Sequence, residues 1–84
     1  VFNPDDFSGK LMRLNFDSTT AKRPIVNNLI KHSNCTVNIL SGNINRLTKG
    51  DVSGYLTIEL GGSDEDIEAT LEELKRQNVG VEVL

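Results

Sequence analysis

The 84-residue sequence has little of what stabilises many small domains: no tryptophan, one cysteine and four aromatic residues in all. Because only 37% of the residues are hydrophobic and so few are aromatic, we expect a core of Leu, Ile and Val. The lone Cys35 excludes a disulfide framework and a cysteine-rich metal site. A buried structural thiol is the expected state of Cys35, and it suits a reducing compartment.

Positive charges are outnumbered, with 9 Lys and Arg residues against 12 Asp and Glu residues. The net charge is −3 and the isoelectric point is about 5.0, without the basic patch that nucleic-acid binders usually carry. No phosphate-binding loop motif is present, so we expect neither ATP binding nor catalysis by this chain. No stretch has the apolar length of a membrane span, and no signal peptide is visible. We expect no metal site, because the acidic run 64–68 is typical of a helix start.

The pattern of apolar residues predicts four strands and two helices. Alternation with a period of two predicts strands over residues 10–16, 35–44, 52–60 and 79–84. Pro24 suits the first turn of a helix that carries Ile25 and Leu29 on its buried stripe, with Val26 and Ile30 beside them. Ser63 lies three residues before Asp66, an N-cap pattern that predicts a second helix, with Ile67, Leu71 and Leu74 buried.

The order of elements is therefore βαββαβ. The two helical connections, residues 17–34 and 61–78, each span 18 residues. This spacing predicts an α+β, ferredoxin-like fold, a four-stranded antiparallel sheet with both helices on one face. We expect residues 1–9 to be a linker from a missing upstream region and residues 10–84 to be the domain.

The alternation also predicts which side chains lie on the face without helices. These are Leu11, Arg13, Asn38, Leu40, Tyr55 and Thr57. Such a mixture is typical of an ordinary antiparallel sheet with one partly solvated face.

The second strand is the more informative one, because this topology places it at an edge of the sheet. Residues 33–45 contain no charged residue and no proline, whereas free edges are usually protected by such residues. We expect the same edge of a second copy to pair with it through Thr36, Val37, Asn38 and Gly42, giving a twofold homodimer. Gly42 is the candidate for a bulge or a close approach. Alternatively, a bulge or the loop predicted at residues 46–51 covers the edge.

This strand contains the segment Val37-Asn38-Ile39-Leu40-Ser41-Gly42, which resembles the NIL domain, a family named for the tripeptide Asn-Ile-Leu. The resemblance covers about residues 11–84, including the Gly61-Gly62 break and the terminal VGVEVL. NIL domains are similar in fold to ACT domains. They form the C-terminal domain of the ATP-binding subunits of ABC methionine importers, where they pair as dimers.

The resemblance implies that this chain is a regulatory domain that binds methionine and restrains transport when methionine is bound. It implies a ligand site at Asn38, which matches the motif asparagine, with Ile39, Leu40 and Ser41 assigned from their proximity. The parent chain would bind ATP and Mg²⁺, associate with membrane permease subunits and lie at the cytoplasmic face of the membrane. The fragment itself would need no cofactor.

Other functions are compatible with the same strand order. Some NIL domains are fused to iron–sulfur modules, so a sensor or protein-interaction module of another NIL-containing protein is one alternative. An RNA-binding module is another, although the predicted open face offers Tyr55 as its one aromatic residue. An acylphosphatase-like enzyme would need a phosphate-binding loop after the first strand, and DSTTAKR lacks glycine.

Overall fold

A computed structural model describes residues 2–46 and 52–84 of the chain. The elements follow in the order η1 (Pro4–Asp6), β1 (Lys10–Phe16), η2 (Thr20–Lys22), α1 (Ile25–His32), β2 (Thr36–Arg46), β3 (Val52–Gly61), α2 (Asp64–Arg76) and β4 (Gly80–Val83). Of the loop predicted at residues 46–51, Arg46 belongs to β2, and the remainder lies outside the described residues. The predicted βαββαβ order is confirmed.

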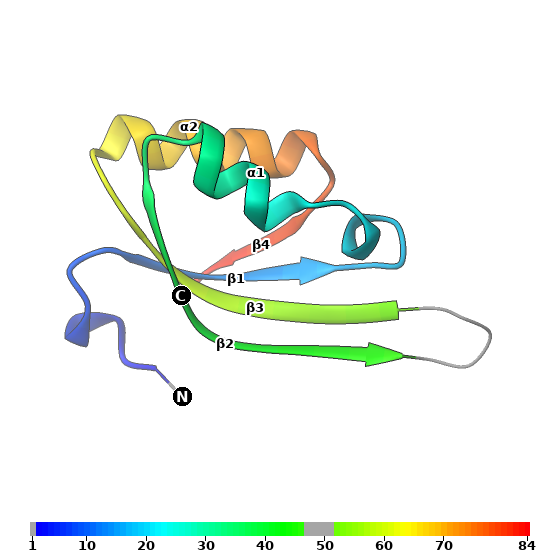
Figure 1. Ribbon diagram of the computed structural model, residues 1–84. Coiled ribbons are helices and arrows are strands. Elements are labelled where there is room, and N and C mark those ends of the chain that lie inside the picture. The colour runs from blue at the N-terminus through cyan, green and yellow to red at the C-terminus, as the bar shows by residue number, and fades with distance from the viewer. Residues whose placement is uncertain (1, 47–51) are drawn as a thin grey trace.

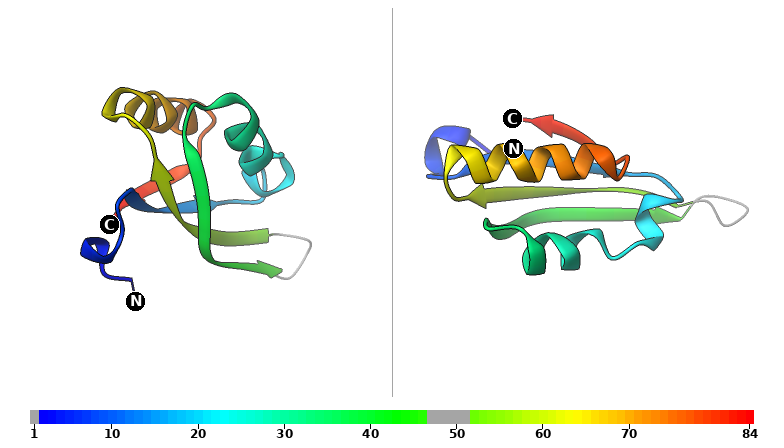
Figure 2. Two further views of the ribbon diagram at one scale, coloured as in Figure 1. Left: turned by 60° about the vertical axis from the view of Figure 1, so that its left-hand side comes forward. Right: turned by 90° about the horizontal axis from the view of Figure 1, so that it is seen from above.

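Among the described residues, the four strands form one antiparallel sheet in the order β2-β3-β1-β4. Both helices cover the same face, with α1 on the side of β2 and α2 on the side of β1 (Figures 1 and 2). The prediction of a ferredoxin-like α+β fold is therefore correct. The N-terminal segment with η1 lies on the opposite side of the sheet, near the start of β1 (Figure 1).

The core lies between the helices and the sheet and is built mainly from aliphatic side chains. Its buried members are Met12, Leu14, Ile25, Leu29, Cys35, Ile58, Leu60, Ile67, Leu71, Leu74 and Val79. Ile30, predicted beside the buried stripe of the first helix, is instead 55% exposed on α1.

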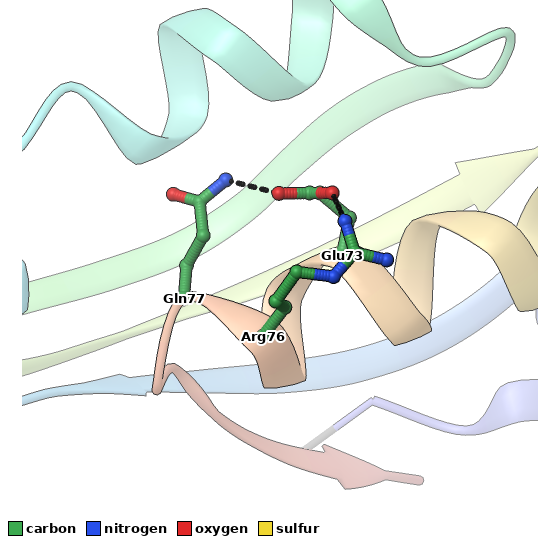
Figure 3. A network of polar contacts seen from close by, with 3 residues as sticks. All are labelled: Glu73, Arg76 and Gln77. Carbon is green, nitrogen blue, oxygen red and sulfur yellow. Dashed lines mark hydrogen bonds and ion pairs between the residues drawn. The ribbon is translucent and has the colours of Figure 1, made fainter.

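The boundaries of α2 follow from local chemistry. The Ser63 hydroxyl accepts a hydrogen bond of 3.1 Å from the backbone N–H of Asp66, so the predicted N-cap is confirmed. Asn78, with a φ of 63°, provides the left-handed residue that ends many helices. Glu73 is half-buried; it forms an ion pair with Arg76 and accepts a hydrogen bond of 2.8 Å from Gln77 (Figure 3). These interactions stabilise the C-terminal end of α2.

A short turn connects β1 to α1. The Asp17 carboxylate accepts hydrogen bonds of 2.9 Å from the backbone N–H groups of Thr19 and Thr20, and one of 3.1 Å from the Thr20 hydroxyl. These donors, first the backbone N–H of Thr20, lower the pKa of Asp17 from its ordinary value of 3.8. Pro24, predicted within the first helical turn, occupies the N-cap position of α1 instead.

Candidate site at the free sheet edge

The strand β2 lies at the edge of the sheet, as the topology predicted. Among the described strands it pairs with β3, so its outer backbone groups have no strand partner. Two large apolar side chains on this edge face solvent, since Ile39 is 51% and Ile44 is 70% exposed. An edge with this composition and exposure is typical of a strand that pairs with another chain.

A β-bulge interrupts β2 in the middle. Ile39 is paired with Ile58 and Ser41 with Thr57, so Leu40 is the extra residue without a partner in the register. Gly42 was predicted to supply either a bulge or a close approach. The bulge lies two residues earlier in the chain. The close approach is confirmed, because a Cβ atom at Gly42 would lie 2.5 Å from Leu56 Cδ2.

The bulge determines on which face of the sheet each predicted ligand residue lies. Asn38 is paired with Glu59 and Ser41 with Thr57, so both lie on the sheet face without helices. Ile39 is opposite Ile58 and belongs to the helix side. Asn38 and Ile39 are exposed, whereas Leu40 and Ser41 are half-buried. The four residues thus offer an amide, a hydroxyl and apolar groups within one short stretch of edge strand.

The predicted dimer-edge residues lie on the same strand. Thr36 is exposed opposite Gly61, and Val37 is half-buried against the core. Together with Asn38 and Gly42 they place the predicted edge along the first seven residues of β2. Pairing through these residues stays a prediction.

The face without helices is less open than the alternation predicted. Leu11 and Thr57 are each only 2% exposed. Thr57 has a short side chain between the longer Tyr55 and Glu59 of its own strand, and it is paired with Arg13. The Arg13 guanidinium carbon lies 5.0 Å from the centre of the Tyr55 ring, within cation–π distance. Arg13 Nε is buried and has no hydrogen-bond partner within residues 2–46 and 52–84.

A residue that the sequence analysis did not single out connects this face to the N-terminal segment. Glu59 Oε2 accepts a hydrogen bond of 2.8 Å from the backbone N–H of Gly9, and Glu59 Oε1 lies 3.5 Å from Asn38 Nδ2. Gly9 and Glu59 are 50 residues apart in the chain. No local pattern signals such a contact; only the register between β1 and β3 places the two segments together.

An apolar groove of about 200 Å³ lies near the far end of β2. Its lining includes Ile44, Leu56, Tyr55, Phe16 and Val26. Asn38 is six residues away from Ile44 along the strand, which corresponds to about 20 Å of extended chain. Within one copy, the groove and the Asn38 amide therefore lie at different ends of β2.

The remaining candidate groups have structural environments. Cys35 is buried, and its Sγ lies 3.4 Å from the Thr70 hydroxyl, as expected for a structural thiol. His32 is exposed at the last position of α1. No cluster of three His, Cys, Asp or Glu side chains suited to a metal ion occurs in the described part of the chain. Likewise, none of the described helices is long and apolar enough to cross a bilayer.

Comparison with known proteins identifies the family. The NIL domain model matches residues 10–83. The chain is 32% identical over 80 residues to the methionine import ATP-binding protein MetN of Bacillus subtilis, covering 95% of this chain and 23% of the relative. It is 37% identical over 82 residues to MetN of Protochlamydia amoebophila, covering 98% of this chain and 23% of that protein.

A solved structure agrees with both the sequence match and the fold. The crystal structure of the C-terminal domain of an ABC transporter ATP-binding protein from Enterococcus faecalis superposes with a TM-score of 0.76 at 37% identity. The match covers 90% of this chain and 83% of that one. Since the chain spans less than a quarter of the MetN relatives, it corresponds to one domain of them. The chain therefore belongs to the NIL domain family and is homologous to the C-terminal domain of MetN methionine import ATP-binding proteins.

Proposed function

We propose that this chain is the methionine-binding regulatory domain of the ATP-binding subunit of an ABC methionine importer, and that it acts as a pair of domains. The parent chain would bind ATP and Mg²⁺ in a separate ATPase domain reached through residues 1–9. It would associate with membrane permease subunits at the cytoplasmic face of the membrane. The similarity of the chain to methionine import ATP-binding proteins supports this assignment.

The observation that carries the proposal is the unprotected edge of β2. Its backbone groups face outward, its described residues up to Asn45 carry no charge, and Ile39 and Ile44 expose 51% and 70% of their surface. Pairing two such edges about a twofold axis satisfies the backbone groups and buries the isoleucines at once.

The chemistry of the edge suits a free amino acid. Such a ligand needs donors for its carboxylate, an acceptor for its ammonium group and an apolar slot for its side chain. The Asn38 amide offers both a donor and an acceptor, and the Ser41 hydroxyl does the same. Aliphatic neighbours such as Ile39 and Leu40 suit a flexible thioether.

Pairing would also bring the ligand residues of the two copies together. In an antiparallel pair of identical strands about a twofold axis, the same face of both strands lies on one side of the joined sheet. The Asn38 and Ser41 side chains of both copies would therefore lie along one seam, on the face without helices.

Regulation follows from differential affinity. Methionine that binds the paired domains more tightly than the separated domains shifts the equilibrium toward pairing. In the parent transporter, a stabilised pair would hold the two ATPase domains in an arrangement unable to hydrolyse ATP. High internal methionine would thereby restrain its own import.

The test is a titration of the 84-residue chain with L-methionine, followed by calorimetry and light scattering together. We expect heat of binding and a shift from monomer toward dimer. Asn38→Ala should weaken binding by about 1–3 kcal/mol, the usual cost of losing a polar partner. The matched control is Asn43→Ala, an exposed asparagine that lies on the same face of β2, opposite Tyr55.

Three outcomes would contradict the proposal in different ways. The absence of binding at millimolar methionine would remove methionine as the ligand and favour a sensor module of another kind. Equal effects of Asn38→Ala and Asn43→Ala would show that Asn38 is a bystander. Binding without any change in mass would remove the paired state from the mechanism.

A further inference from the structure

We infer that Glu59 is a positioning residue, through which docking of the N-terminal segment orients the Asn38 amide for ligand binding. The inference rests on the proposed function, since it concerns the same site. Its basis is the two-sided contact of one carboxylate, with the backbone N–H of Gly9 at 2.8 Å and Asn38 Nδ2 at 3.5 Å.

The orientation of the Asn38 amide follows from the chemistry of its partner. An ionised carboxylate only accepts hydrogen bonds, so the Asn38 atom that faces Glu59 Oε1 must be the NH₂ group. The carbonyl oxygen, Oδ1, is then directed away from Glu59. Since Asn38 is exposed at the free edge, Oδ1 is available as an acceptor there. Glu59 therefore selects the amide orientation that suits a ligand ammonium group.

The N-terminal segment in turn holds Glu59. The Gly9 N–H donates to the second carboxylate oxygen, and the chain passes very close to β3 at this point. A Cβ atom on Gly9 would lie 2.5 Å from the Leu60 carbonyl oxygen and 2.8 Å from Glu59 Cγ. Both contacts are shorter than van der Waals separation, so only glycine permits this path of the chain.

These contacts couple two places in the domain. Docking of Gly9 fixes the Glu59 carboxylate, the carboxylate fixes the Asn38 amide, and the fixed amide binds the ligand with less loss of rotamer freedom. Because coupling between two binding events is reciprocal, ligand at Asn38 must also tighten the docking of Gly9. The segment that responds is the one proposed to lead to the ATPase domain.

Two substitutions separate the steps. Gly9→Ala should displace the N-terminal segment without changing the chemistry of the Glu59 or Asn38 side chain. Glu59→Gln should keep an acceptor for Gly9 but present its NH₂ group to Asn38, which reverses the amide and directs Nδ2 outward. The matched control is Glu68→Gln, an exposed glutamate on α2 with the same change of charge.

Calorimetry with L-methionine and N-acetyl-L-methionine then tests the orientation, because the acetylated compound lacks the ammonium group. We expect Glu59→Gln to weaken methionine binding about tenfold or more, the usual effect of losing a hydrogen bond to a charged group. The preference for methionine over its acetylated form should fall with it. A merely structural role of Glu59 would weaken both compounds equally and would overturn the inference.

Amide hydrogen exchange at Gly9 tests the coupling. Methionine should slow this exchange in the wild-type chain, and Gly9→Ala should weaken methionine binding while Glu68→Gln leaves it unchanged. If the Gly9→Ala and Glu59→Gln variants bind methionine as tightly as the wild-type chain, the inference is overturned and the proposed function stands. Failure of the wild-type chain to bind methionine would overturn both.

Discussion

The exposed edge allows a quantitative prediction for Ile39→Lys. Complete burial of an isoleucine side chain stabilises a protein by about 1.5–3 kcal/mol. Ile39 is 51% exposed, so burying the remainder at an interface contributes about 0.8–1.5 kcal/mol per copy. A twofold pair counts this contribution twice, and the substitution should therefore raise the dimer dissociation constant about 10- to 150-fold. Repulsion between the two introduced lysines adds to the effect.

The assay is sedimentation equilibrium with and without methionine, and the control is Val83→Lys. Val83 is 53% exposed on β4, the opposite edge of the sheet, so it carries the same change at matched exposure. Thermal unfolding at low protein concentration should show that neither substitution destabilises the monomer by much. Equal weakening by both substitutions, or none by Ile39→Lys, would refute the assignment of the interface to β2.

Three further predictions concern stability. Leu74→Ala, at a side chain only 2% exposed, should lower the free energy of unfolding by about 2–5 kcal/mol in urea titrations; a smaller loss would mean that the site collapses around the cavity. Ser63→Ala should cost about 0.5–2 kcal/mol by the same measurement, unless water replaces the cap of α2 without loss. Because the pKa of Asp17 is lowered on folding, its charge stabilises the fold above about pH 3.8, and this stabilisation is lost as the pH falls through the lower folded value. Asp17→Asn should remove that component from an acid titration of stability, and an unchanged profile would contradict it.

The sequence predicted the elements well because their signals are local. Period-two alternation marked β1 and β3, and the Ser63 cap and the Gly61-Gly62 break marked the start of α2. Even the edge position of β2 followed from equal connection lengths. Each of these inferences uses residues that are close together in the chain.

What the sequence missed depends on contacts between distant segments. No residue type in the sequence marks the bulge at Leu40, whereas a glycine within a strand often marks one. Gly42 was therefore the predicted candidate. The burial of Leu11 and Thr57, each 2% exposed, does not follow from their alternation, which places both on the face without helices. For the candidate site, Asn38 came from a family resemblance, whereas Glu59 emerged only when the sheet register brought it between Asn38 and Gly9.

The bulge in β2 has a consequence for assembly. A regular strand can slide along an identical neighbour by two residues and still form equivalent hydrogen bonds. The extra residue at Leu40 removes this equivalence, because each alternative alignment places the irregularity against a different part of the neighbour. A pair of such edges would therefore have one preferred alignment, and the same two residues would meet each time the complex forms.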